Sequence, residues 1–212
     1  ISCVHKKIIT QKMDILQILK NLPIDLGQAN LRTTTQGKVI AMNFVENGID
    51  KTALDIGCRE GHQTQILEKK GYKVTSIDIQ KQYEKCIVMD VNNGLPFDDS
   101  QFDLIWCSEV IEHLSTPPNS LKEFKRVLKK GGKMIITTPN SHFWFYRITN
   151  FFGKSAKDLQ NPGHKFFFSE KNIIELFPSS EIYGFFPYIW KKFTIKNHIG
   201  LLSPTFIICC YK

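Results

Sequence analysis

The stretch TALDIGCREGH at residues 52–62 decides the fold, together with VTSID at residues 74–78. The first begins with residues typical of a buried strand, turns between two glycines and continues into a helix. The second is another short strand, and it ends in Asp78. In an open α/β sheet, ligands bind outside the carboxyl ends of the strands, where an acid can accept ribose hydroxyls. The two stretches therefore predict a nucleoside-binding half-site.

The glycine spacing does not favour a dinucleotide. The fingerprint G-x-G-x-x-G would place glycines at positions 57, 59 and 62, whereas the chain has Gly57, Arg59 and His62. The close approach of a pyrophosphate to the turn is therefore poorly served.

Residues 54–61 instead match the pattern L-D-I-G-C-G-x-G at every defined position except Arg59. This pattern resembles the first motif of the class I S-adenosylmethionine-dependent methyltransferases, whose cofactor carries no phosphate. The segments LPF at 95–97, FDLI at 102–105 and RVLKKGG at 126–132 resemble later signatures of the same family. The resemblance is strong over about residues 50–140, and it implies a Rossmann-like α/β fold.

The resemblance assigns roles to individual residues. It implies that Asp55 contacts the methionine end, that Gly57 and Gly61 line the turn, and that Asp78 accepts the ribose hydroxyls. Asp90 would take the adenine amino group. The further cofactor contacts it implies are Cys58, Ile79, Val91 and Ser108. The alternatives are that Asp78 is a strand-end turn acid and that Asp90 is an ordinary loop acid.

Arg59 stands where the family usually has glycine. If this position requires a positive φ, a side chain there costs about 1 kcal/mol and could crowd the cofactor. The alternative is that Arg59 points outward while the two glycines form the turn.

Residues 109–113 read Glu-Val-Ile-Glu-His. If they form a helical turn, Glu109, Glu112 and His113 share one face, where they could bind a divalent metal or present His113 as a general base. The arrangement resembles that of ubiquinone-pathway O-methyltransferases and of small-RNA 3′-end 2′-O-methyltransferases, where it is associated with a metal. It also resembles that of glycan and lipid methyltransferases, which need no metal. His164 lies in a segment resembling one found downstream in these groups, and it is either a second active-site histidine or a lid histidine. We expect base catalysis by His113 or His164 without a metal.

The order of patterns predicts one methyltransferase domain over residues 1–212. N-terminal helices fill residues 1–48, with helical spacing at 11–20 and 34–47, and residues 49–140 form the cofactor-binding core. Strands are predicted at 52–56, 72–77, 86–89, 102–107 and 133–138, and helices at 62–70 and 118–130. A final pair of strands, 181–186 and 205–211, lies within residues 181–212. The predicted sheet has seven mostly parallel strands with an antiparallel last strand, and the resemblance implies the order 3-2-1-4-5-7-6.

Residues 141–180 interrupt this alternation. Fifteen of the 25 aromatic residues in the chain lie between Phe143 and Trp190, which is more than regular strands and helices would place there. We interpret residues 141–168 as a substrate lid, with ordinary core packing as the alternative. An apolar lid could also contact a membrane surface.

Composition limits the remaining choices. The chain has 212 residues and no apolar run long enough for a transmembrane helix. Its six cysteines form no C-x-x-C pair, as expected of a reduced cytoplasmic protein. Its first residue is Ile1, so a targeting segment is only weakly excluded. The net charge is +8, but the densest basic run, 122–130, has helical spacing and predicts a solvated helix face, with an anionic partner such as RNA or phospholipid as the alternative.

These observations predict a methyltransferase acting on an oxygen of a small glycan, lipid-linked or quinone-like acceptor. One alternative is a metal-dependent 2′-O-methyltransferase of RNA ends, and another is a non-catalytic binding module that kept the fold. Nothing in the sequence indicates an oligomeric state.

Overall fold

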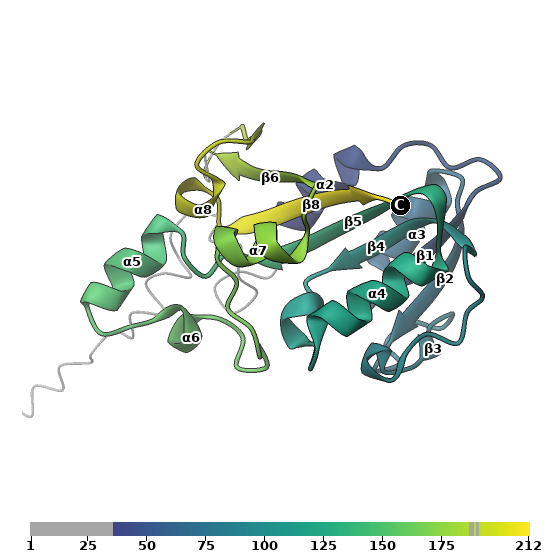
Figure 1. The fold of residues 1–212 in the computed structure, drawn as a ribbon, viewed down its shortest axis with the longest axis horizontal. Helices are drawn as coiled ribbons and strands as arrows, with labels where there is room; N and C mark the ends of the chain where they lie inside the picture. Colours follow the sequence, from purple (N-terminus) through teal and green to yellow (C-terminus); the bar gives the residue numbers. More distant parts are fainter. Residues whose placement is uncertain (1–35, 187–188, 190) are drawn as a thin grey trace, which may run out of the picture.

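The computed structural model describes residues 36–186, 189 and 191–212. Within these residues, one eight-stranded sheet has the order β3-β2-β1-β4-β5-β8-β6-β7 (Figure 1). The strands are β1 Thr52–Ile56, β2 Lys73–Asp78, β3 Ile87–Val88, β4 Phe102–Ser108, β5 Leu128–Pro139, β6 Glu181–Phe186, β7 Phe193–Ile195 and β8 Thr205–Tyr211. The first five strands pair in parallel, and β8, β6 and β7 add antiparallel pairs.

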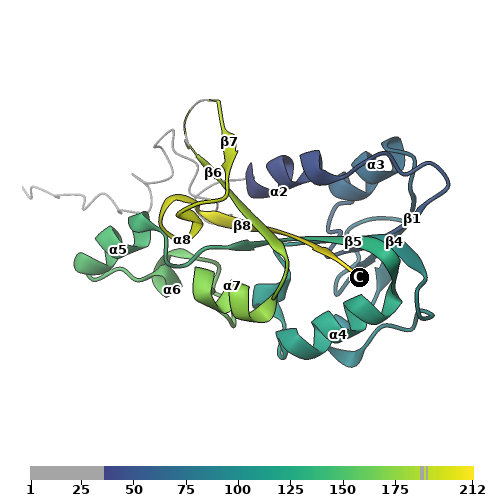
Figure 2. The same ribbon diagram turned by 45° about the horizontal axis from the view of Figure 1, so that its top comes forward.

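Helices cover both faces of this sheet. They are α2 Gln36–Ala41, α3 His62–Lys69, α4 Pro117–Val127, α5 Trp144–Phe151, α6 Ala156–Leu159, α7 Glu170–Leu176 and α8 Ile199–Leu202. Three short 3-10 helices are η1 Met42–Phe44, η2 Val91–Asn93 and η3 Ile111–His113. Figure 2 shows α2 and α3 on one face of the sheet and α4 and α7 on the other. The predicted helix at 11–20 and the start of the one at 34–47 lie outside the described residues.

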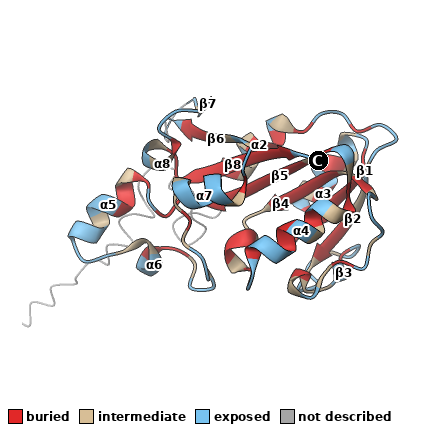
Figure 3. Cartoon of the chain, viewed as in Figure 1, coloured by how far each residue is buried: buried red, intermediate tan, exposed pale blue. Residues whose placement is uncertain are grey.

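The central strands are buried on both faces, which explains their continuous apolar runs. On β5, Met134 and Ile136 pack with α4, whereas Ile135 packs in the core cluster that contains Leu67 of α3. Figure 3 shows this burial along the strands, with exposed residues on the outer faces of the helices. The period-2 alternation of a strand therefore sends neighbouring residues into two separate cores.

The predicted strand order is confirmed, but the predicted count of seven was one short. The strand β7 forms a hairpin with β6, in which Phe186 pairs with Phe193 and Gly184 with Ile195. It is only three residues long and none of its residues is buried, so its Phe-Thr-Ile alternation is too short to indicate a strand.

The predicted helix 118–130 was too long. The helix α4 ends at Val127, because Leu128 pairs with Phe102 of β4 and the backbone N–H groups of Ser100 and Gln101 donate to carbonyls of the last turn. The basic run is therefore no single solvated helix face, since Lys129 lies on β5 and binds Asp103.

Arg126, another residue of that run, is tied to the loop before β4. Its guanidinium donates to the carbonyl oxygens of Leu95 and Phe97 and to the carboxylates of Asp99 and Glu123. This fork of hydrogen bonds holds the loop against α4.

The aromatic segment after β5 divides into a packed part and an exposed part. Phe143, Phe145 and Tyr146 form a small core with Leu159 of α6 and Phe185 of β6. The outer side of α5 is exposed. Packing therefore explains some of these aromatic residues, and the lid assignment stays a prediction.

The five cysteines within the described residues are buried and free, as is typical of thiols that act as small apolar core residues. No helix among the described residues is long and apolar enough to cross a membrane.

Candidate active site

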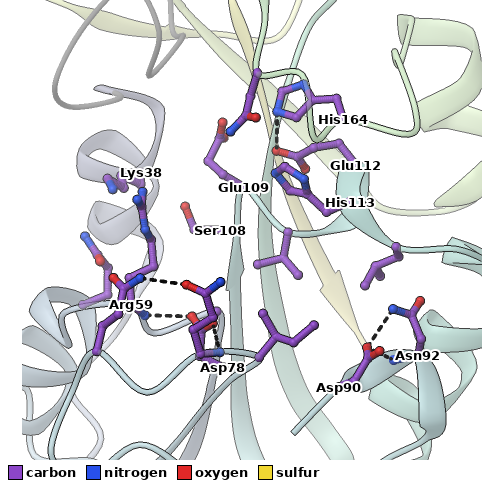
Figure 4. Close-up of a pocket in the computed structure, with 18 residues that line it drawn as sticks. Lys38, Arg59, Asp78, Asp90, Asn92, Ser108, Glu109, Glu112, His113 and His164 are labelled. Atoms are coloured by element: carbon purple, nitrogen blue, oxygen red, sulfur yellow. Dashed lines mark hydrogen bonds and ion pairs between the residues drawn. The ribbon is translucent and has the colours of Figure 1, made fainter. Parts of the chain in front are cut away.

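A cavity of about 590 Å³ opens at the carboxyl ends of β1, β2 and β4 (Figure 4). Its volume suits a small-molecule ligand. The sequence-predicted residues on its wall are Gly57, Asp78, Ile79, Asp90, Ser108, Glu109, Glu112, His113 and His164. Parallel strands bring these side chains together because their carboxyl ends meet at one edge of the sheet.

The glycine turn is fixed to the next strand by its backbone. The N–H groups of Gly57 and Cys58 donate to the carbonyl oxygen of Ile77 at 2.8 and 3.1 Å. Gly57 has φ +78°, and a Cβ there would clash with Cγ2 of Val110. Glycine is therefore favoured at position 57 both by conformation and by space.

Arg59 occupies the left-handed region, with φ +46°. Its backbone N–H donates to Oδ2 of Asp78 at 3.0 Å, and the residue borders the cavity. The family's usual glycine is therefore replaced at a position that does have a positive φ. The alternative that Arg59 points outward does not fit its place on the cavity wall.

The two acids expected to hold the nucleoside are both oriented by short loops. Asp78 accepts hydrogen bonds from the N–H of Arg59 and, at 3.0 Å, from that of Gln80. Oδ1 of Asp90 accepts from the backbone and side-chain amides of Asn92 at 2.9 and 2.7 Å. Both carboxylates thus reach the cavity in defined positions.

Asp55 lies behind the cavity wall. It is 1% exposed, and the Thr64 hydroxyl donates to its Oδ2 at 2.6 Å and pairs with Ser76 at 2.8 Å. Burial raises the pKa of the Asp55 carboxyl to about 6. The Thr64 hydroxyl, on α3, thus links Asp55 of β1 to Ser76 of β2 under the turn.

Three other predicted cofactor contacts, Cys58, Gly61 and Val91, also lie outside the lining, and Cys58 and Val91 are buried. Direct contact of these three, and of Asp55, with a cofactor stays a prediction.

Glu112, His113 and His164 form what we call the acid–imidazole cluster. One ligand atom from each lies within 4.8 Å of the others, and the two imidazole rings meet edge to face with centroids 4.7 Å apart. The approach of His164 depends on backbone hydrogen bonds, because the N–H groups of Lys165 and Phe166 donate to the carbonyl oxygen of Glu112 at 2.8 and 3.1 Å.

The predicted common helical face at 109–113 was wrong, although its residues do reach one cavity. Glu109 has φ +57°, and the helical turn is the 3-10 helix η3. Two threonines of β5 orient the carboxylates instead. Thr137 donates to Oε1 of Glu109 at 3.0 Å, and Thr138 donates to Oε2 of Glu112 at 2.9 Å.

Hydrogen bonds define the tautomer of both imidazoles. Nδ1 of His113 lies 2.9 Å from the carbonyl oxygen of Gly163, and Nδ1 of His164 lies 3.1 Å from Oε1 of Gln160. Because a carbonyl oxygen can only accept, each Nδ1 carries the hydrogen. Each Nε2 then has a lone pair for a proton or a metal.

The electrostatics of the cluster favour an added positive charge. Glu112 is 1% exposed, and its Oε1 has no hydrogen-bond partner among the described residues and lies 3.9 Å from Nε2 of His164. Burial, and after it the nearby Glu109, raises the pKa of Glu112 well above its usual range. Burial, followed by the neighbouring His113, lowers the pKa of His164 to about 4. A proton or a cation between these groups would satisfy the orphaned oxygen.

The donor set also indicates which metals would fit. One carboxylate oxygen and two imidazole nitrogens suit Mn²⁺, Co²⁺ or Zn²⁺ better than Mg²⁺, which prefers oxygen ligands.

Several residues on or behind the wall were missed in the sequence. Lys38 of α2 borders the cavity, and Gln160 orients His164 from a buried position. Neither has a local motif. The pair Thr137 and Thr138, at the carboxyl end of a predicted strand, was a usable signal for polar contacts at the site.

Comparison with known proteins agrees with this geometry. Residues 54–136 match the model of the methyltransferase domain family. The chain is 29% identical over 126 residues to the ubiquinone biosynthesis O-methyltransferase of Coxiella burnetii, an alignment that spans 52% of the chain and 54% of the relative. It is 31% identical over 94 residues to the malonyl-[acyl-carrier protein] O-methyltransferase of Erwinia pyrifoliae, spanning 40% and 36%. The chain thus spans about half the length, or less, of these curated relatives.

The crystal structure of an S-adenosylmethionine-dependent methyltransferase from Archaeoglobus fulgidus shares the fold. It covers 83% of the chain and 94% of its own, with a TM-score of 0.60 and 16% identity. The fold is thus the Rossmann-like one of that class. Residues 54–136 thus form a methyltransferase domain, and the fold is that of the class I methyltransferases, whose cofactor is S-adenosylmethionine. At Gly57 a ligand can approach the backbone closely, and Asp78 offers a carboxylate to the same cavity. Both features suit a nucleoside cofactor.

The left-handed conformation of Arg59 predicts a difference between two substitutions that both remove the guanidinium. Arg59→Gly should be more stable to urea than Arg59→Ala by about 0.5–1 kcal/mol. This is the strain of a left-handed side chain less the entropy that glycine adds to the unfolded chain. Equal midpoints, or a more stable alanine variant, would show that the turn does not require a positive φ at this position.

The carboxylate of Asp78 predicts a loss of cofactor affinity. We expect Asp78→Ala to weaken the binding of S-adenosylhomocysteine by about 1.5–3 kcal/mol, because ribose hydroxyls lose a charged acceptor. Titration calorimetry measures this, and Glu60→Ala, which removes an exposed acid from the same turn, should bind as the parent does. Thermal melting without ligand checks that the variant remains folded. An unchanged dissociation constant for Asp78→Ala would refute the half-site assignment.

Proposed function

We propose that this chain transfers a methyl group from S-adenosylmethionine to an oxygen of a small acceptor. The observation that carries the proposal is that one cavity contains both the nucleoside carboxylate Asp78 and the acid–imidazole cluster. A donor bound at one end and an acceptor hydroxyl at the other would share the same space. The names of the two curated relatives, both O-methyltransferases, support transfer to oxygen.

The chemistry asks mainly for alignment. S-adenosylmethionine supplies the methyl group, and the residues of the chain have to orient the acceptor in line and exclude water. An oxygen–carbon bond forms as the sulfur–carbon bond breaks, which leaves S-adenosylhomocysteine. The hydroxyl proton must go to a base.

We assign that base to Nε2 of His113. The hydrogen bond from Nδ1 to Gly163 fixes the ring and leaves Nε2 to accept a proton. The positive charge that results is next to Glu112, whose ionised form it would stabilise. The lowered pKa of His164 makes this second imidazole a poor base near neutral pH, because an effective base has a pKa near the working pH. His164 would act as a neutral neighbour of His113.

A second candidate function is metal-assisted methylation of a 2′-hydroxyl at an RNA end. The orphaned Oε1 of Glu112 favours it, because a divalent ion held by the cluster would satisfy that oxygen and polarise a hydroxyl. The net charge of +8 is compatible with RNA. Binding of a short RNA that weakens steeply with salt would support this candidate. Under the first proposal, with a quinone-like, glycan or lipid-linked acceptor, no such salt-dependent binding of RNA is expected.

Turnover after chelation separates the two mechanisms. Transfer of labelled methyl from S-adenosylmethionine would be measured with a panel of catechols, isoprenyl phenols and oligosaccharides, before and after EDTA. We expect activity to survive chelation and to fall by about 10²–10⁴-fold in His113→Ala, the range for loss of a general base. His142→Ala, which removes an exposed histidine outside the cavity lining, should keep activity.

Activity that returns only with Mn²⁺, and that is lost in Glu112→Gln, would instead establish metal assistance. Calorimetric titration of the protein with Mn²⁺ alone gives a readout independent of the acceptor. Failure of the parent protein to bind S-adenosylhomocysteine would favour the non-catalytic binding module.

A further inference from the structure

The outer side of α5 and the turn that follows it form an exposed apolar surface, which we call the aromatic tip and define as Ile148, Phe151 and Phe152. These side chains are 51%, 86% and 71% exposed. The two phenylalanine rings meet edge to face, with centroids 5.4 Å apart. Adjacent phenylalanines of such exposure leave a large apolar area in contact with water.

Backbone hydrogen bonds fix the turn after α5 that carries Phe152. Past the end of α5, the N–H of Phe152 and that of Lys154 donate to the Thr149 carbonyl at 3.0 and 2.9 Å, and Gly153 donates to Asn150 at 2.9 Å. Gly153 has φ +77°, the left-handed conformation typical of a helix end. The next helix begins with a capping box of Ser155 and Asp158.

The opposite side of α5 is anchored. Phe145 and Tyr146 are buried with Phe143, Leu159 and Phe185. The helix is therefore held to the body of the protein by one set of aromatic residues while it presents another outward. Figure 1 shows α5 at the end of the molecule away from β3, where no described element covers its outer side.

Basic side chains flank the aromatic tip. Arg147, Lys154 and Lys157 are exposed on α5, on the turn and on α6. The one acid of this stretch, Asp158, accepts hydrogen bonds from Ser155 in the capping box. Apolar side chains that protrude beside cations match the layered chemistry of an anionic bilayer, with apolar chains below negative headgroups.

We propose that the aromatic tip inserts into the interface of a bilayer that contains anionic phospholipid, with Arg147, Lys154 and Lys157 on the headgroups. The contact is peripheral. The chain runs from α6 directly into Gln160 and His164, so a tip seated on a membrane would place that surface beside the wall of the cavity. This inference rests on the proposed function: a membrane surface beside the cavity favours an acceptor that reaches the site from the bilayer. Vesicle binding needs no turnover, so the docking proposal can fail independently of the proposed function.

Flotation of the full chain with vesicles tests the proposal. Phosphatidylcholine vesicles with phosphatidylglycerol should bind the protein, and pure phosphatidylcholine vesicles should bind it more weakly. We expect Phe151→Ser/Phe152→Ser to weaken binding by at least about tenfold, because two rings no longer enter the interface. Lys154→Glu should weaken binding to the anionic vesicles by at least about fivefold.

Two matched controls keep the result specific. Ile49→Ser removes an apolar side chain that is 75% exposed and lies outside the aromatic tip. Lys171→Glu reverses the charge of a side chain that is 84% exposed. Both should bind as the parent does. Because every altered side chain is exposed, melting temperatures should stay unchanged.

The proposal would be overturned if the parent protein bound neither kind of vesicle. It would also be overturned if the parent and the double phenylalanine variant bound equally. Self-association in sedimentation velocity that the double variant abolishes in the absence of vesicles would overturn it as well. That result would assign the tip to a second copy of the chain.

Discussion

The hydrogen bonds that join the glycine turn to the carbonyl of Ile77 are the constraint on which the rest of the site depends. They hold the end of β1 against the end of β2, so that Asp78 and Gly57 face one cavity. The buried group of Asp55, Thr64 and Ser76 fixes the same junction from below. A left-handed backbone at Arg59 completes the turn, and its N–H binds the carboxylate that is expected to hold the ribose.

The other end of the cavity depends on the backbone of Glu112. Its carbonyl oxygen accepts two N–H groups from the segment that carries His164, while one oxygen of its buried carboxylate has no hydrogen-bond partner within the part of the chain that the structure describes. A buried acid that lacks a full set of hydrogen bonds is costly. Such groups are retained where a proton or a cation is exchanged, which is why the same geometry allows a base and a metal site.

Much of the fold could be predicted because the apolar patterns are local. The strands at 52–56, 181–186 and 205–211 have the predicted bounds. The predicted end of α4 was wrong because Leu128 pairs with β4 although the helical spacing continues past it. No local sequence pattern indicates such pairing between distant segments. The edge strand β7 was missed because its Phe-Thr-Ile alternation spans three residues, which is too short to indicate a strand.

The sequence predicted which residues line the site better than it predicted the contacts that orient them. Glu109, Glu112 and His113 do line one cavity, but threonines from β5 and a left-handed residue place them there, in place of the expected helical face. Gln160 orients His164 while it is itself hydrogen-bonded to Ser141, a residue 19 positions earlier in the chain. Only the tertiary structure brings these two segments together. Arg59 was recognisable as a departure from a pattern, and its positive φ is the conformation that favours the glycine usual at this position.

A crystal structure with S-adenosylhomocysteine would show whether the donor and the base share one cavity. We expect the ribose hydroxyls on the Asp78 carboxylate and the ligand sulfur directed toward Nε2 of His113. A ligand bound with its sulfur away from the acid–imidazole cluster, or outside this cavity, would contradict this expectation.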